Sequence, residues 1–405
     1  MYDIAIIGAG PAGATLARLI GSKYKVLLVD RRRWNETDRS ERGKCCGGLL
    51  APDAQKMLSR LGLGLPKSVL VEPQLFVVRT IDIPRRSERY YQRFYINMDR
   101  REFERWLVSM VPSCIDCRFG CRFKSYDRRD GGFDIALAHD GRLVIERARM
   151  IVGADGASSL VRRRMMFCKT LESSSGKSFS EQSGATAGLS GDALRDSAAD
   201  TAGQAGSDTL VQQNINPYFS IQHWMESDPS QPFFSAIFDP EITDFYCWTI
   251  PKGELLLVGA ALKPKDDASA KFDLLIERLR PFGFRFGQVV RREGTFIMRP
   301  TRSDDLSTGA RGVALLGEAG GWISPSSAEG FSYAFHSALI LSEVIREGID
   351  GFERRYARAM RSLRWNLFLK RCKSRLIFNS ALRNIAMRSG FQSIEYPGGG
   401  NIYGC

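Results

Sequence analysis

The sequence lacks a long apolar segment and a secretory start. Of its 405 residues 43% are hydrophobic, but no apolar run approaches the roughly 18 residues that a transmembrane helix needs. The opening MYDIAIIG has neither the basic region nor the cleavage site of a signal peptide. The nine cysteines are an odd number, as expected for thiols in a reducing compartment. We therefore expect a cytoplasmic protein that can touch a membrane but does not span one.

The sequence also lacks a nucleic-acid-binding module and a full set of metal ligands. The net charge of +13 favours anionic partners such as phosphate-bearing ligands or anionic lipid. Without a recognisable module, we expect no nucleic-acid partner. Cys114, Cys117 and Cys121 cluster, but a structural zinc site needs four ligands, and His139 and His223 lie far away in the sequence. We expect no metal site.

What the sequence has is a strand, a glycine turn, a helix and a second strand at its beginning. Residues 3–7 predict a buried strand, residues 11–22 a helix, and KVLLVD a strand that ends at Asp30. The glycines Gly8, Gly10 and Gly13 allow a tight turn and close approach of a pyrophosphate to the helix start. Asp30 is placed to accept a hydrogen bond from a ribose hydroxyl, and Arg31 follows it. The complete turn reads Gly8-Ala9-Gly10-Pro11-Ala12-Gly13.

Two later turns distinguish FAD from NAD as the dinucleotide. Gly153 to Arg162 follows a predicted strand and contains Asp155 and Gly156. Gly317 and Glu318 follow the predicted strand GVALL and lead into a helix. NAD needs one βαβ unit, whereas the longer FAD needs further strand ends to hold its ribityl chain and isoalloxazine. The three turns together favour FAD.

These three motifs resemble those of the flavoprotein superfamily that contains aromatic hydroxylases, flavin-dependent halogenases and geranylgeranyl reductases. The resemblance implies that the first motif binds the pyrophosphate and that Asp155 lies behind the cofactor. It also implies that Glu318 stands where the family usually has an aspartate meeting the ribityl hydroxyls. Arg100 matches the family's arginine that approaches the cofactor from a helix start. The segment from Trp322 to Gly330 resembles the loop beside the isoalloxazine, whose donors could stabilise charge on reduced flavin.

Two segments narrow the resemblance toward the geranylgeranyl reductases. Lys44 to Leu49, which contains Cys46, Gly47 and Gly48, is similar to the reductases' Cys-Gly-Gly segment near the flavin ring. Residues 246–251 are similar to their Tyr-x-Trp-x-Phe-Pro motif, which lines the substrate cavity. The matching residues are Tyr246, Trp248, Ile250 and Pro251. Ile250 departs from this motif and matches the halogenases' Trp-x-Trp-x-Ile-Pro, so the Cys-Gly-Gly segment decides for the reductases.

The resemblance and the pattern of elements together imply a two-lobed α/β fold. We expect an FAD-binding Rossmann-like domain of the glutathione-reductase type, an antiparallel-sheet substrate domain and a helical C-terminal tail. The FAD-binding domain comprises 1–70, 96–165 and 301–350, and the substrate domain comprises 71–95 and 210–300. Residues 166–209 are rich in Ser, Gly and Ala and are expected to be a flexible insertion. Residues 351–405 form the basic helical C-terminal region.

The expected function is reduction of carbon–carbon double bonds in a prenyl or other apolar substrate by hydride transfer from reduced FAD. NAD(P)H or another external donor would reduce the flavin, although the sequence shows no second nucleotide-binding unit. One alternative is a flavin-dependent monooxygenase or halogenase-like enzyme. A second alternative is a flavin electron-transfer protein without a substrate of its own.

Several residues have a structural interpretation beside the functional one. Cys46 is a candidate proton relay, or a small buried thiol beside two glycines. Tyr246 and Trp248 alternate along a strand and form either a core pair or an apolar substrate wall. The basic C-terminal helix, with Trp365 and Phe368 between its charges, is a solvated helix packed on the body or a contact with an anionic membrane.

Overall fold

The first lobe of the protein is built around an eight-stranded sheet. The computed structural model describes residues 1–34, 44–175, 216–227 and 232–396. For residues 168–175 and 216 it describes the backbone alone. Its strands run in the order β15-β16-β9-β1-β2-β6, and the β7–β8 hairpin continues from β9. The four pairings among β16, β9, β1, β2 and β6 are parallel. The bounds are β1 Tyr2–Ile7, β2 Val26–Asp30, β6 Asp116–Phe119, β7 Cys121–Arg129, β8 Gly132–His139, β9 Arg142–Gly153, β15 Gly309–Ala310 and β16 Val313–Leu315.

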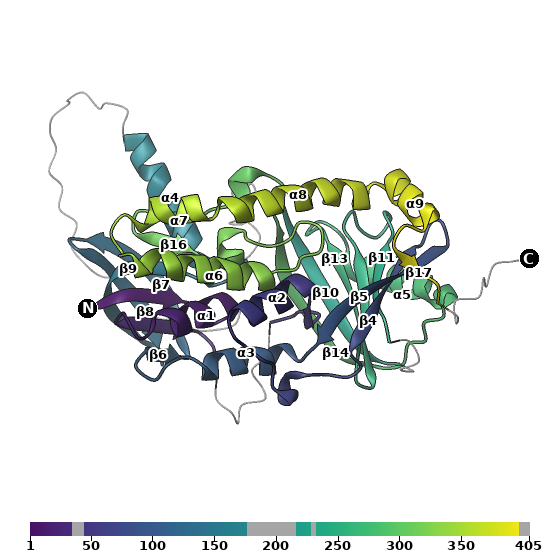
Figure 1. The fold of residues 1–405 in the computed structure, drawn as a ribbon, viewed down its shortest axis with the longest axis horizontal. Helices are drawn as coiled ribbons and strands as arrows, with labels where there is room; N and C mark the ends of the chain where they lie inside the picture. The colour runs from purple at the N-terminus through teal and green to yellow at the C-terminus, as the bar shows by residue number, and fades with distance from the viewer. Residues whose placement is uncertain (35–43, 176–215, 228–231, 397–405) are drawn as a thin grey trace, which may run out of the picture.

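The central strands are apolar on both faces, because helices cover one face and the β7–β8 hairpin covers the other. All five residues of β2 are buried, as continuous apolar runs in parallel sheets usually are. Helices α1 (Pro11–Ile20) and α6 (Phe331–Arg346) pack together over one face, with Ile4 and Leu28 in the shared core. Helices α2 (Pro52–Arg60) and α3 (Arg100–Ser109) lie beside them (Figure 1). The βαβ unit predicted from the first 30 residues is confirmed.

The second lobe is a nine-stranded sheet in the order β14-β10-β13-β12-β11-β4-β5-β17, with β3 paired to β5. Strands from both 71–95 and 210–300 join it, and all its pairings are antiparallel except β4 with β11, which is parallel. The sequence analysis predicted an antiparallel sheet. The parallel pair is possible because β4 and β11 are remote in the chain and need no hairpin between them. The bounds are β3 Leu49–Leu50, β4 Leu75–Asp82, β5 Ser87–Asn97, β10 Asn216–Glu226, β11 Phe234–Phe238, β12 Cys247–Lys252, β13 Leu255–Leu262, β14 Val289–Arg299 and β17 Ser393–Ile394.

The remaining helices connect and cover the two lobes. Helix α5 (Ala268–Leu279) packs on the second sheet, and the C-terminal helices α7 (Phe352–Ala359), α8 (Arg361–Phe378) and α9 (Ser380–Ser389) close the chain. Figure 1 shows α8 running along the top of the molecule across both lobes. Short 3₁₀ turns are η1 Lys67–Val69, η2 Arg280–Phe282, η3 Ser303–Asp305 and η4 Gly317–Gly320.

The expected insertion at 166–209 is described only in its first part. Helix α4 spans Leu160–Ser175, so residues 166–175 are helical, and residues 176–209 lie outside the described residues. The Gly-rich C-terminal end, 397–405, also lies outside them. Among the helices that the structure describes, none combines the length and apolar character needed to cross a bilayer. The mixed α/β fold with a helical C-terminal region confirms the predicted fold class.

Candidate functional site

The glycine turn between β1 and α1 has the shape of an anion cradle. Gly8 adopts φ +105°, and a Cβ there would lie 2.5 Å from the Ala154 carbonyl oxygen. A Cβ at Gly13 would lie 1.8 Å from the Gly8 oxygen, so the helix can approach the turn only without a side chain. At Gly10 nothing lies within 4 Å of the Cβ position. Gly10 is the N-cap of α1 and provides no side-chain cap, so the first-turn N–H groups face a space that a pyrophosphate can fill.

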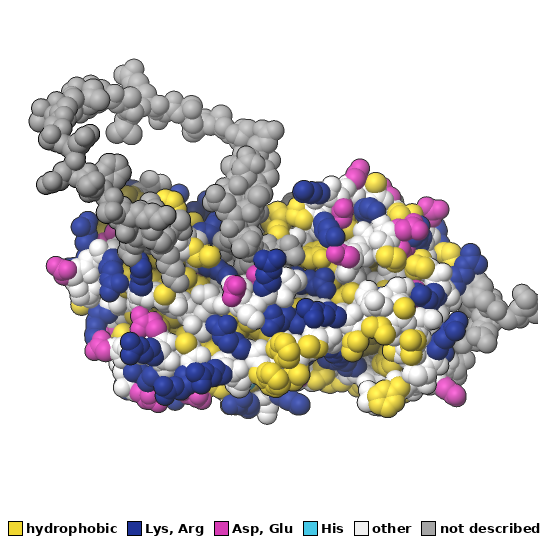
Figure 2. All heavy atoms as spheres, turned by 90° about the horizontal axis from the view of Figure 1, so that it is seen from above, with side chains coloured by type: hydrophobic (Ala, Val, Ile, Leu, Met, Phe, Trp, Pro, Cys, Tyr) yellow, Lys and Arg dark blue, Asp and Glu magenta, His cyan; other side chains and the backbone are white. Residues whose placement is uncertain are grey.

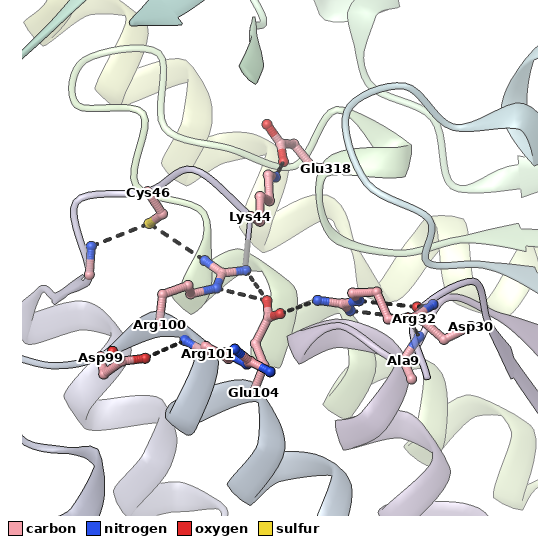
Figure 3. A network of polar contacts seen from close by, with 11 residues as sticks. Ala9, Asp30, Arg32, Lys44, Cys46, Asp99, Arg100, Arg101, Glu104 and Glu318 are labelled. Atoms are coloured by element: carbon pink, nitrogen blue, oxygen red, sulfur yellow. Dashed lines mark hydrogen bonds and ion pairs between the residues drawn. The ribbon is translucent and has the colours of Figure 1, made fainter. Parts of the chain in front are cut away.

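A chain of buried polar contacts runs from this turn to Cys46 (Figure 3). Ala9 N donates to the Asp30 carboxylate over 2.7 Å, and Asp30 in turn pairs with Arg32. Arg32 also pairs with Glu104, and Glu104 accepts from Arg100 Nε over 2.7 Å. Arg100 Nη1 lies 3.6 Å from Cys46 Sγ. The end of β2, the start of α3 and the segment around Cys46 are thereby held in one arrangement.

Glu104 is the centre of this network. Burial by itself would raise the pKa of Glu104, but Arg100 and Arg32 lower that pKa to about 2. The carboxylate therefore stays charged between two guanidinium groups, with 3% of its side chain exposed. Asp99 caps the same helix by accepting from the N–H groups of Arg101 and Glu102.

Replacing Glu104 with glutamine is expected to destabilise the protein by about 3 kcal/mol, because two buried cations lose their shared partner. Since the folded-state pKa lies below the unfolded value, the wild-type stabilisation from this group is present above about pH 4.5 and is lost as pH falls toward 2. Urea unfolding at several pH values measures both effects. Glu102→Gln, at the more exposed position 102 of the same helix, is the matched control; equal loss in both variants would contradict the prediction.

The segment Lys44–Gly48 lies between the two lobes, and its residues contact elements of both. Lys44 pairs with Glu318 in η4, and the Cys45 thiol donates to Gln222 Oε1 on β10 over 3.1 Å. Cys46 contacts Arg100, and it accepts from Gly48 N over 3.4 Å. A Cβ at Gly47 would lie 2.6 Å from Ile250 Cδ1 on β12, so Gly47 packs closely against that strand. The Lys44–Gly48 segment therefore connects the first lobe to the second sheet.

Lys252 on β12 also binds the Lys44–Gly48 segment. Its Nζ donates to the carbonyl oxygens of Gly48 (3.0 Å) and Met98 (2.8 Å) in a buried position. Burial lowers the pKa of Lys252 to about 7, although the nearby Cys46 and Asp99 act in the opposite direction. At neutral pH the amine is thus close to the balance between its charged and neutral forms.

The stability of the flavin-free protein is expected to rise by about 1.5 kcal/mol between pH 7 and 8.5. In that window the unfolded Lys252 still binds a proton and the folded one loses it, so raising the pH favours the folded state. Lys252→Met is expected to remove this contribution and flatten the profile. Urea unfolding of both proteins across the window measures the difference, and identical slopes would contradict the assignment.

Asp155 and Glu318 stand at the other two strand ends but have different partners. Asp155 accepts from Ser159 Oγ (2.6 Å) and from Leu160 N (2.7 Å), so it caps the start of α4 and holds the Ala154 turn against Gly8. Glu318 pairs with Lys44 and lies in η4, whose first residue Gly317 packs between α1 and α6. Asp155 thus shapes the turn through the backbone, while Glu318 keeps a carboxylate close to the Lys44–Gly48 segment.

An apolar aromatic cluster borders the same segment on the second sheet. The rings of Tyr246 and Trp248 lie 5.5 Å apart, and Tyr246 donates to the Ser327 carbonyl in the loop that leads to Gly330. Gly330 is the N-cap of α6. Trp248 Nε1 is buried without a hydrogen-bond partner among the described residues. The cluster also includes Ile250, Leu257, Phe245, Leu75 and Tyr218.

The structure brings most of the residues singled out in the sequence into one region. The glycine turn, Asp30, Arg100 and Cys46 belong to one chain of contacts, and Ile250 touches Gly47. Pro251 lies next to it on β12, and its carbonyl accepts from Asn97 over 2.8 Å. Arg31 is exposed, and its neighbour Arg32 joins the network instead. Gly156, with φ +79°, turns the chain after Asp155.

Sequence reasoning missed Arg32, Glu104, Gln222 and Lys252. Glu104 stands four residues after Arg100, a spacing at which helical ion pairs form, so that signal was available. No such signal was available for Lys252, because a lysine at a strand end is ordinarily solvated. Among the described residues, no group of three or more His, Cys, Asp and Glu side chains could hold a metal ion.

Comparison with known proteins agrees with this geometry. A family model described as an FAD binding domain matches residues 1–181. Protein CbrA of Escherichia coli O6:H1 is 36% identical over 400 residues, covering 98% of this chain and 96% of the relative. Protein CbrA of Shigella sonnei is 36% identical over 393 residues, covering 97% and 98%.

Solved structures share the fold at low sequence identity. A geranylgeranyl bacteriochlorophyll reductase-like protein of Thermoplasma acidophilum has a TM-score of 0.68 at 15% identity, covering 95% of this chain and 89% of that one. The flavin-dependent halogenase CmlS has a TM-score of 0.65 at 15% identity, covering 91% and 63%. PqsL of Pseudomonas aeruginosa, a probable FAD-dependent monooxygenase, has a TM-score of 0.61 at 17% identity, covering 96% and 99%.

The cradle at Gly10, the uncapped start of α1 and the matched FAD-binding model together fit FAD as the cofactor. The sequence identity to CbrA extends over 98% of the chain and so includes both lobes. The chain is a member of the CbrA family, and its first 181 residues match the model of an FAD binding domain.

Proposed function

We propose that this protein reduces carbon–carbon double bonds of a prenyl or similarly apolar substrate. The observation that carries the proposal is the position of the Lys44–Gly48 segment. This segment lies between the first lobe, which carries the glycine turn and is called the FAD-type lobe, and the aromatic cluster of the second sheet. One thiol of this segment, Cys46, is held by Arg100 on the cofactor side. The arrangement supports chemistry at an interface between a flavin and an apolar molecule.

FAD would be held by residues of the first lobe. Gly8, Gly10 and Gly13 with the start of α1 would receive the pyrophosphate. Asp30 and Arg32 would bind the ribose of the adenosine half. Glu318 and the loop before Gly330 would hold the ribityl and ring parts, together with the Arg100–Cys46 pair. Reduced FAD, when bound, supplies a hydride, and we propose cytoplasmic NAD(P)H as the external donor that reduces it.

The chain's own residues orient the substrate and supply a proton. An isolated alkene is not polarised, so placement against the cofactor contributes much of the barrier reduction. Tyr246 and Trp248 form an apolar wall suited to hold a prenyl chain. The Cys46 thiol is the proposed proton donor to the second alkene carbon. The likeness of fold to the geranylgeranyl bacteriochlorophyll reductase-like protein supports this assignment.

Oxygen-dependent hydroxylation is the second candidate function. Its support is the unpaired Trp248 Nε1, because a donor buried in the aromatic cluster suits a substrate that carries a polar acceptor. The halogenase CmlS and the probable monooxygenase PqsL have the same fold. This candidate implies a compact aromatic substrate rather than a prenyl chain.

An anaerobic reoxidation assay tests the two candidates against each other. The flavin is reduced, oxygen is excluded, and geranylgeraniol or a shorter prenyl alcohol is added while flavin absorbance is followed. Reoxidation, together with a product that has gained two hydrogen atoms by mass spectrometry, supports the reductase. Absence of reoxidation by every isoprenoid, with oxygen uptake and an oxygenated product from a small aromatic compound, would favour the second candidate.

A further inference from the structure

Helix α8 has two apolar faces, and among the residues that the structure describes only one of these faces is covered. Leu363 and Leu367 are buried against the first lobe. On the opposite face Trp365, Leu369 and Leu376 are 62%, 51% and 55% exposed, and they stand four and seven residues apart along the helix. Spacings of this kind place side chains in one line on an α-helix. A surface helix ordinarily presents polar residues there, and within the described part of the chain this second stripe stays exposed.

The stripe continues onto the neighbouring helix and the turn after it. Leu382 and Ile385 on α9 are 43% and 65% exposed, and Phe391 is 75% exposed. Figure 2 shows apolar and basic side chains mixed over the face of the molecule that carries these helices. Scattered exposed apolar residues are normal, but an extended patch of large ones indicates a binding surface.

The charged residues of the segment that carries the stripe have one sign. Residues 354–394 contain eleven Lys and Arg and no Asp or Glu. Arg361, Lys373 and Arg375 are exposed on α8 and flank the apolar line. Aromatic and aliphatic side chains between cations are the pattern of helices that lie in the surface of an anionic bilayer.

Contacts on the inner side hold α8 firmly, so that the outer face is presented as a fixed surface. Lys370 pairs with Asp53 over 3.0 Å, and Arg371 Nη1 donates to the Thr301 carbonyl over 3.3 Å. Arg299 donates to Ser374 Oγ over 3.0 Å. These bonds connect α8 to α2, to the end of β14 and to the segment that follows β14.

We propose that the outer face of α8 and α9 docks this protein on an anionic lipid bilayer. A second copy is a poorer occupant, because a two-fold contact would bring two surfaces of the same positive sign together. The bilayer supplies both an apolar layer for Trp365 and phosphate groups for the flanking cations. The inference rests on the surface alone and holds whichever reaction the flavin site performs.

Vesicle flotation of the flavin-loaded protein tests the proposal. The probes are vesicles of phosphatidylcholine alone and vesicles with about 30% phosphatidylglycerol, at low and high salt. We expect binding to the anionic vesicles, at least tenfold weaker binding without phosphatidylglycerol, and loss of binding in high salt. The combined variant W365S/L369S/L376S and the combined variant R361Q/K373Q/R375Q should each bind at least tenfold more weakly.

The matched control is the combined variant L143S/I145S, which removes two comparably exposed apolar residues from β9, at 66% and 57% exposed. It should bind the vesicles as the wild type does, and retained flavin absorbance verifies that every variant is folded. Absent binding to anionic vesicles, or equal binding by all variants, would overturn the proposal. A concentration-dependent dimer that the W365S/L369S/L376S variant abolishes, without lipid binding, would assign the face to a second copy instead.

Discussion

Gly10→Leu is expected to produce a folded protein without FAD. The free space around the Gly10 Cβ position means that the leucine side chain meets no protein atom within 4 Å of its first carbon. Gly10 has φ −71°, which any residue adopts, so the backbone is not strained. The side chain would instead fill the space of the pyrophosphate. We expect FAD affinity to fall at least about a thousandfold, which is roughly 4 kcal/mol.

Flavin fluorescence titration of the flavin-free protein measures that affinity, and urea unfolding measures stability separately. The matched control is Gly64→Leu, since Gly64 also has open space around its Cβ position and lies outside the site. It should leave both quantities unchanged. If Gly10→Leu bound FAD normally, the cradle would not be the pyrophosphate site. The variant Gly13→Ala cannot serve here, because its Cβ would clash with the Gly8 oxygen and disturb the fold itself.

Cys46→Ala is expected to slow reoxidation of the reduced flavin by an isoprenoid about a thousandfold, within the range found for loss of a general acid. The expected cause is loss of the proton that the Cys46 thiol delivers beside Arg100. Reduction of the flavin by NAD(P)H should proceed at its normal rate, because that step does not use the thiol. Stopped-flow absorbance separates the two half-reactions.

The adjacent Cys45 provides the control for this prediction. Its thiol is buried and donates to Gln222, and burial raises the pKa of Cys45 to about 12, so it is a poor source of protons. Cys45→Ala should therefore leave the reoxidation rate within a few-fold of the wild type. Equal slowing of both half-reactions in Cys46→Ala would show that the residue shapes the flavin site and does not move a proton.

Local patterns in the sequence were sufficient to predict the main strands and helices of the FAD-type lobe. The buried run of β2, the glycine turn and the start of α1 at Pro11 are properties of consecutive residues. The same holds for the helix that begins at Arg100 and is capped by Asp99. The parallel pairing of β4 with β11 was not foreseeable, since pairing of distant strands depends on packing and not on local pattern.

The sequence by itself indicated a dinucleotide cofactor. Gly8 and Gly13 are required by the shape of the turn between the first strand and helix, and Gly10 leaves the space beside the turn open. Only the tertiary structure decided which side chains surround the candidate site. Glu104 lies 72 residues from Arg32, and Lys252 lies 204 residues from the Gly48 carbonyl that it binds. Such contacts form only when distant parts of the chain pack together. Arg32 and Arg100 then lower the pKa of Glu104, whereas burial lowers the pKa of Lys252. A linear pattern carries neither the contact nor the burial.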